Sequence, residues 1–107
     1  GLTERVKAFS VAPRVIIDNT SSNRQTVVEI NGLDRVGLLH ALTEALFHLN
    51  LNIASAHITT FGEKAIDVFY VTDLTGAKIE NPARHAQIEK RLMQVLAPEA
   101  EDLRTGT

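Results

Sequence analysis

The chain has 107 residues and no cysteine, which excludes disulfides, a thiolate metal site and a cysteine nucleophile. Aromatic residues are scarce, at 5% of the sequence, and neither sign of charge dominates, because the formal net charge is −2. A nearly neutral chain has no strong field to draw it to nucleic acid or to anionic lipid, so we expect neither a nucleic-acid partner nor a membrane partner. No apolar run approaches the roughly 18 residues of a membrane-spanning helix.

Hydrophobic residues make up 44% of the sequence, which is enough for one core and too little for two. The chain starts at Gly1 without an initiator Met, and we interpret it as a segment of a longer protein. Residues 1–13 have little pattern and end at Pro13, so they are predicted to form a linker or arm. Residues 14–97 are predicted to form the domain, and 98–107 a flexible tail.

Four strands are predicted from β-branched and apolar runs. Residues 14–19 and 25–31 flank a short polar cluster and are typical of a β-hairpin. Residues 51–61 and 63–73 flank Gly62 and predict a second, tighter hairpin.

Two helices are predicted from apolar spacing and from a helix-start signal. Apolar residues recur at helical spacing over 36–50, and we expect one stripe of them to lie in the core: Leu38, Leu42, Leu46 and Leu49. Asn81 followed by Pro82 is typical of a helix start, and that helix should end before Pro98.

The order β-β-α-β-β-α predicts an α+β domain, with an antiparallel four-stranded sheet and both helices on one face. Without its first strand, this order is one strand short of the ferredoxin-like βαββαβ unit. We expect the N-terminal strand to replace the usual last strand beside the second strand of the chain. Phe69 and Tyr70 are expected to pack in the core and on the sheet face.

The turn between the second strand and the first helix carries the main functional signal. Its glycines, Gly32 and Gly37, have the spacing of a phosphate-binding loop, but two leucines follow where Lys and Ser or Thr are required. The remaining interpretation is a helix N-terminus whose free amides favour an anion such as an amino-acid carboxylate. Asp34 could bind an α-ammonium group or cap the helix, and the sequence leaves both open.

The stretches DRVGLL and NIASAHITTFGEKAIDVFYVTD resemble the ACT-domain family of amino-acid sensors. Within that family they are most similar to the C-terminal ACT domains of bifunctional uridylyltransferase/uridylyl-removing enzymes. The resemblance covers about residues 12–97. It implies a ferredoxin-like ACT domain that senses glutamine and regulates the uridylylation of a PII nitrogen-signalling protein in the bacterial cytoplasm. It also implies that any divalent metal and all catalytic residues belong to the parent nucleotidyltransferase and hydrolase, with no cofactor, metal or catalytic residue in this segment.

The resemblance implies a ligand site between two paired ACT domains, so a second ACT domain is an expected partner. One domain would contribute Asp34, Arg35, Val36, Gly37 and Leu38, and the other would contribute Asn52, Ile53 and Ala54. The family usually has proline where this chain has Val36, a change that could loosen the turn. The alternative is an ACT dimerisation or packing module that binds no free amino acid. A stand-alone enzyme resembling acylphosphatase is disfavoured, because its phosphate-binding arginine has only Arg35 as a candidate.

Other polar residues are given structural interpretations. His40 and His48 flank Glu44 at four-residue steps, and such a face is more often solvated surface than a metal site. His57 either lines the ligand site or packs beside it. Asp67 is expected on the less buried face of its strand or paired with a basic residue.

Overall fold

The computed structural model describes residues 11–97. The predicted tail 98–107 and most of the predicted arm lie outside these residues. The elements follow one another in the predicted order: β1 (Arg14–Asp18), β2 (Thr26–Leu33), α2 (Leu38–His48), β3 (Asn52–Phe61), β4 (Lys64–Thr72) and α3 (Pro82–Leu96). The largest differences from prediction are in β2, which continues through Gly32 to Leu33, and in α2, which begins at Leu38.

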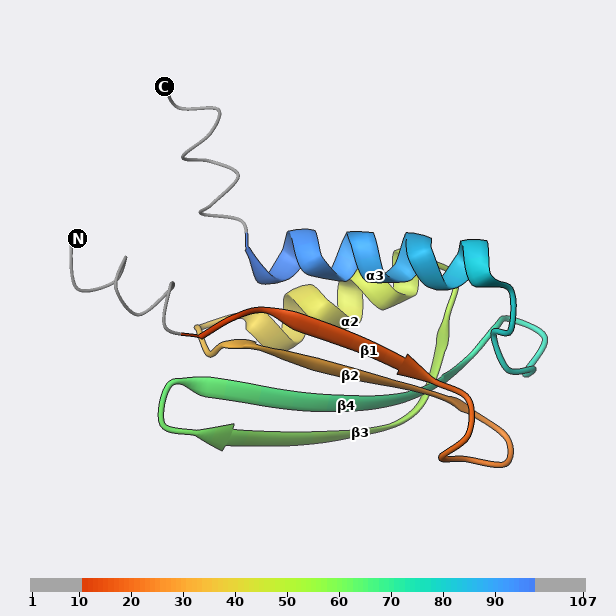
Figure 1. Ribbon diagram of the computed structural model, residues 1–107, viewed down its shortest axis with the longest axis horizontal. Coiled ribbons are helices and arrows are strands. Elements are labelled where there is room, and N and C mark those ends of the chain that lie inside the picture. The colour runs from red at the N-terminus through yellow and green to blue at the C-terminus, as the bar shows by residue number, and fades with distance from the viewer. Residues whose placement is uncertain (1–10, 98–107) are drawn as a thin grey trace, which may run out of the picture.

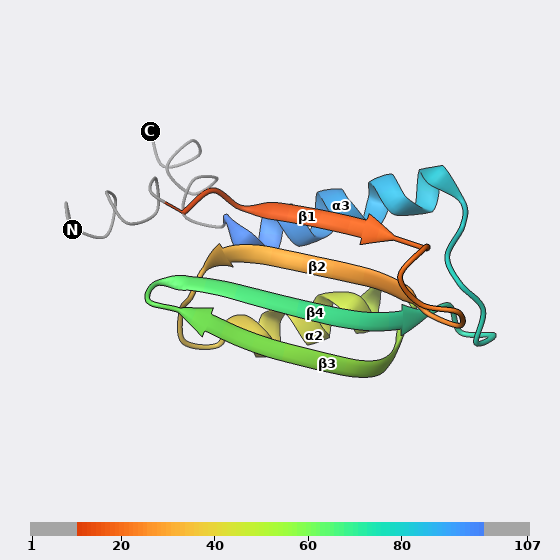
Figure 2. The same cartoon turned by 60° about the horizontal axis from the view of Figure 1, so that its bottom comes forward.

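The four strands form one antiparallel sheet in the order β1-β2-β4-β3. β1 lies beside β2, with Arg14 opposite Asn31 and Asp18 opposite Val27. This is the place that the last strand takes in a ferredoxin-like unit, so the predicted replacement is confirmed. Figures 1 and 2 show both helices on one face of the sheet, with β1 and β3 at its two edges.

The core lies between the sheet and the helices. The predicted stripe of α2 is buried in it, as is Phe69 from β4. Tyr70, the next residue of β4, points to the open sheet face and is half-buried there. The fully buried core side chains come from both layers: Val28, Ile30, Leu42, Leu46, Phe69, Val71, Ile88 and Leu92.

The helix α3 begins as predicted. The side chain of Asn81 accepts hydrogen bonds from the backbone amides of Ala83 and Arg84, at 2.8 and 3.4 Å, and Pro82 occupies the first turn. These bonds satisfy two of the amides that a helix start leaves without partners.

The last turn of α3 lies over β2. A Cβ atom on Gly32 would come within 2.7 Å of Leu96 Cδ2, closer than packed carbon atoms approach. Because Gly32 has no side chain, α3 can approach the sheet closely at this point.

Buried polar contacts hold the loop before α3 against the β1–β2 loop. Thr26 is fully buried, and its Oγ1 donates to Asn19 Oδ1 at 2.6 Å and accepts from the Ile79 amide at 2.9 Å. Asn19 Nδ2 in turn donates to the Ile79 carbonyl at 2.7 Å. These bonds connect segments more than 50 residues apart and set the position from which α3 starts.

Candidate functional site

The β2–α2 connection contains a β-turn. The Leu38 amide donates to the Arg35 carbonyl at 3.2 Å, and Gly37 has φ 82° and ψ 1°. These values match the third position of a type II turn, where positive φ favours glycine, and they place Val36 at the second position, where proline is favoured. Val36 is fully exposed. Proline at position 36 would therefore suit the turn that precedes α2.

The N-terminus of α2 has no side-chain cap and no acidic residue in its first turn. The interpretation of Asp34 as the helix cap is therefore wrong. Among the described residues, the amides of Gly37, Leu39 and His40 have no backbone acceptor. These amides and the positive end of the helix dipole can receive an anion.

Arg35 binds within the domain. Its Nη2 donates to the Val95 carbonyl in the last turn of α3, at 3.1 Å. A cation at a helix C-terminus satisfies an open carbonyl and interacts favourably with the helix dipole. Arg35 thus joins the β2–α2 turn to α3, and its predicted ligand contact stays a prediction.

The two halves of the predicted site lie at opposite ends of β3. Asn52 pairs with Thr72 at one end, and its Nδ2 donates to the Asp73 carbonyl at 3.4 Å. The other end, at Phe61, lies near the turn because the Asp34 amide donates to the carbonyl of Glu63. A strand rises about 3.3 Å per residue, so one copy does not bring the Asp34–Leu38 turn and Asn52, Ile53 and Ala54 together.

The strand β3 forms a wholly exposed sheet edge. All ten of its residues are exposed, and none is charged or proline. A register shift between Ile53 and Ser55 leaves Ala54 as an extra residue near the start of the strand. Large apolar side chains are also exposed on β3 and on α2, which contacts β3: Leu39, Phe47, Ile53, Ile58 and Phe61. A long, uncharged edge of this kind is a template for pairing with another strand.

The structure contradicts the expectation for Asp67. The residue is 2% exposed, alternates in β4 with buried Ala65 and Phe69, and faces the helices. Its Oδ1 has no hydrogen-bond partner in the part of the chain that the structure describes. Burial raises the pKa of the Asp67 carboxyl above its usual value, and the negative charge of Asp34 adds to this effect. Period-2 alternation in AIDVFYV places Asp67 on the same face as Ala65 and Phe69, but both faces of this stretch are mainly apolar, so the alternation does not reveal which face the helices cover.

The histidines lie outside the turn. His40 and His48 contact Glu44 at 3.3 and 3.6 Å on one exposed face of α2, so the predicted solvated face is confirmed. His57 packs edge-on against Tyr70, with 5.5 Å between the ring centroids. Across residues 11–97 no three His, Cys, Asp or Glu side chains are arranged to hold a metal ion. Neither helix in that range is long and apolar enough to cross a membrane.

Comparisons with known proteins agree with this fold. The model of the ACR family N-terminal ACT domain matches residues 21–97. The chain is 58% identical over 93 residues to a bifunctional uridylyltransferase/uridylyl-removing enzyme of Nitrobacter hamburgensis, covering 87% of this chain and 10% of that protein. It is 57% identical over 97 residues to the protein of the same name from Rhodopseudomonas palustris, covering 91% of this chain and 10% of the relative.

A solved structure shows the same fold. An unknown protein from Galdieria sulphuraria matches with a TM-score of 0.51 and 23% identity, over 66% of this chain and 37% of that chain.

The present chain spans about a tenth of the length of the uridylyltransferase/uridylyl-removing relatives. The chain belongs to the ACT-domain family.

Proposed function

We propose that this ACT domain senses glutamine and thereby regulates a larger bacterial, cytoplasmic enzyme that adds and removes uridylyl groups on a PII nitrogen-signalling protein. The support is the high identity to relatives that carry the name bifunctional uridylyltransferase/uridylyl-removing enzyme. The domain itself would contribute no catalytic residue and no cofactor. The divalent metal of the reaction would belong to the catalytic part of the larger protein.

The proposed ligand site is argued from the uncapped N-terminus of α2. The ligand carboxylate would accept hydrogen bonds from the amides of Gly37, Leu39 and His40, which have no other backbone acceptor among the described residues. Asp34 is exposed beside this turn and does not cap the helix. Its carboxylate would receive the α-ammonium group, so the turn offers complementary partners to both charges of an amino acid.

A second ACT domain would complete the site. If two copies paired antiparallel along β3 about a two-fold axis, the Asn52 end of one strand would lie opposite the Phe61 end of the other. Asn52, Ile53 and Ala54 of one domain would then approach the Asp34–Leu38 turn of its partner. Ligand binding would regulate the larger enzyme only if it favoured one arrangement of the paired domains over another.

The second candidate is a packing module without a free ligand. The exposed, uncharged edge of β3 favours this alternative, because it would associate whether or not an amino acid is bound. Both candidate functions predict that the domain self-associates. Only the sensor is expected to bind an amino acid selectively, so ligand binding distinguishes the two.

The test is calorimetric titration of the chain with glutamine, using glutamate and serine as comparison ligands. We expect selective binding of glutamine, and about tenfold weaker binding by Asp34→Asn because a charged hydrogen-bond partner is lost. Glu89→Gln removes the same charge from the exposed face of α3 and should bind as the unchanged chain does. Gly37 is a poor probe, since any side chain there strains the turn.

Sedimentation of each variant shows whether self-association is kept. Absence of glutamine binding in a chain that still self-associates would reject the sensor and favour the packing module. Unchanged affinity in Asp34→Asn would place the ammonium site elsewhere.

A further inference from the structure

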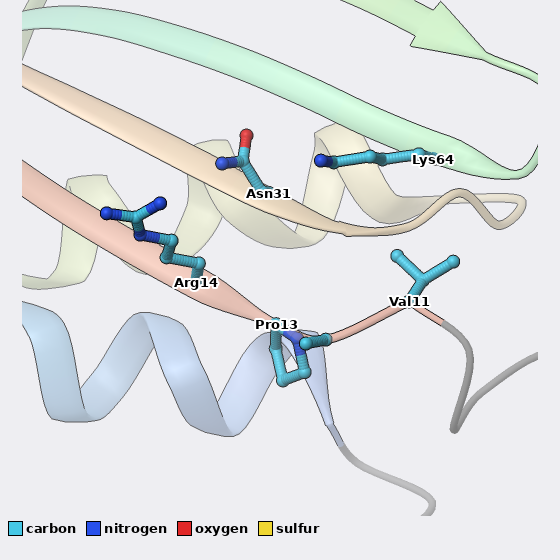
Figure 3. Close-up of a pocket in the computed structure, with 6 residues that line it drawn as sticks. Val11, Pro13, Arg14, Asn31 and Lys64 are labelled. Atoms are coloured by element: carbon cyan, nitrogen blue, oxygen red, sulfur yellow. The ribbon is translucent and has the colours of Figure 1, made fainter.

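A hollow lined by both apolar and polar side chains lies on the sheet face that the helices leave open, at the edge formed by β1. It has a volume of about 320 Å³ and is lined by Val11, Ala12, Pro13, Arg14, Asn31 and Lys64. Arg14 and Asn31 are direct cross-strand neighbours, so their side chains share a face. That face is the open one, because Ile30 and Ala65, which adjoin Asn31 and Lys64, are buried on the helix side. Figure 3 shows the three polar side chains around this hollow.

Asn31 supplies an unused hydrogen-bond acceptor. The residue is only 7% exposed, and its Nδ2 donates to a carboxylate oxygen of Glu29 at 3.0 Å. An ionised carboxylate only accepts hydrogen bonds, so this contact fixes the amide orientation and turns Oδ1 away from Glu29. Oδ1 is buried and has no hydrogen-bond partner within residues 11–97. A buried acceptor without a donor is costly and uncommon, so this acceptor is available to a donor other than residues 11–97.

Two cationic side chains flank this acceptor. The side chain of Lys64 extends toward Asn31 in Figure 3, and Arg14 lies on the other side of the amide. Neither Arg14 nor Lys64 forms an ion pair with another residue of the described range 11–97. The carboxylate of Glu29 accepts a hydrogen bond from the Asn31 amide and does not line the hollow. The two charged residues that line the hollow, Arg14 and Lys64, are both cationic, so the hollow favours an anion.

We propose that this hollow binds a small dianion that also carries a hydroxyl or N–H donor. Its anionic groups would meet Arg14 and Lys64, and its donor would bond to Asn31 Oδ1. The hollow lies on the opposite face of the sheet from α2, so this site is separate from the amino-acid site and does not rest on it.

Calorimetric titration with malate and succinate tests the proposal, because the two dicarboxylates differ by one hydroxyl group. We expect malate to bind about fivefold more tightly than succinate, the effect of one added neutral hydrogen bond. Arg14→Gln and Lys64→Gln should each weaken malate binding about tenfold. Arg24→Gln removes the same charge from the exposed β1–β2 loop and should leave binding unchanged. Glycerol 3-phosphate, titrated in parallel, shows whether phosphate replaces carboxylate.

Asn31→Leu isolates the acceptor and should abolish the preference for malate over succinate. If that variant does not fold, the malate preference of the unchanged chain still tests the acceptor. Failure of both malate and glycerol 3-phosphate to bind at millimolar concentration would overturn the proposal. An equal loss of malate affinity in Arg24→Gln and Arg14→Gln would also overturn it. Malate binding should persist in Asp34→Asn, and glutamine binding in Arg14→Gln, so the failure of either site is recognised separately.

Discussion

At the scale of single residues, Val36 and Gly37 hold the two special positions of one type II turn. Gly37 has positive φ and open space around its Cα, so a side chain there meets backbone strain and no steric clash. Val36 is fully exposed, and its amide makes no backbone hydrogen bond among the described residues. The conformation of the turn, and not close approach of a ligand, is thus sufficient reason for the glycine.

Opposite effects are expected from substitutions at these two positions. Val36→Pro should raise the free energy of unfolding by about 0.4–1 kcal/mol, because proline restricts the unfolded chain and suits the second turn position. Gly37→Ala should lower it by about 1 kcal/mol or more, because alanine is strained at positive φ. Urea denaturation measures both effects. Destabilisation by Val36→Pro would show that the turn is not type II.

Asp67 should make stability depend on pH. Because its pKa is raised above 3.8 in the folded state, the folded protein holds this proton more tightly than the unfolded chain does. The resulting stabilisation is present below the unfolded pKa and is lost as the pH rises through the folded pKa. Asp67→Asn stays neutral and should be more stable than the unchanged chain at pH 7. The difference should shrink below about pH 4. If the difference in stability between Asp67→Asn and the unchanged chain were the same at every pH, the raised pKa of Asp67 would not be its cause.

Asp18 provides a control, because its pKa is shifted in the opposite direction from that of Asp67. Hydrogen bonds from Ser21 and Thr20 to its carboxylate lower its pKa from 3.8 to about 2. The resulting stabilisation is present above the unfolded pKa and is lost as the pH falls toward 2. Asp18→Asn should therefore be less stable than the unchanged chain at pH 7 and approach it on acidification. Thermal unfolding across this pH range compares the two variants directly.

At the scale of elements, the position of α3 depends on contacts with β2. Leu96 covers Gly32, and Arg35 donates to the Val95 carbonyl. Both contacts join the last turn of α3 to the region where β2 ends and the β2–α2 turn begins. The geometry of this turn therefore depends on how α3 packs.

Filling the space at Gly32 tests this packing. Gly32→Ala should lower the free energy of unfolding by about 1 kcal/mol, because the new methyl group overlaps the end of the Leu96 side chain. Combining it with Leu96→Ala should cost less than the sum of the two single changes, since the smaller side chain leaves room for the methyl. A double-mutant cycle in urea measures this coupling. Strict additivity would show that the two side chains do not compete for space.

At the scale of the whole molecule, the exposed edge of β3 governs association. In a two-fold antiparallel pair, the middle of β3 meets the middle of its partner. Ala56 lies near this centre, opposite Phe69 of β4. A charge introduced there faces an identical charge on the second copy, which disfavours pairing.

Ala56→Lys is therefore expected to be monomeric at concentrations where the unchanged chain self-associates. Ala86→Lys adds the same charge on the exposed side of α3 and should associate as the unchanged chain does. Sedimentation at several concentrations distinguishes them. Persistent dimers of Ala56→Lys would place the interface on another surface. If the ligand site needs both domains, Ala56→Lys should also weaken glutamine binding.

The sequence alone was sufficient for the order of the elements, the core stripe of α2 and the start of α3. Each depends on local periodicity or on a cap within a few residues, such as Asn81 and Pro82. The turn after β2 was also recognisable from Gly37, whereas Gly32 proved to lie within the strand. The predicted ligand residues remain predictions, because one copy holds the turn and the start of β3 at opposite ends of a strand.

Tertiary structure decided the features that depend on contacts between distant segments. The roles of Gly32 and Arg35 follow from α3, which lies some 60 residues further along the chain. The burial of Asp67 follows from the elements that cover β4, and a carboxylate within an alternating strand does not by itself reveal which face is covered. The hollow beside Asn31 forms only when β1, β2 and β4 are aligned in register. Local patterns determine elements because their causes lie within a few residues, whereas sites arise where the fold brings separate elements together.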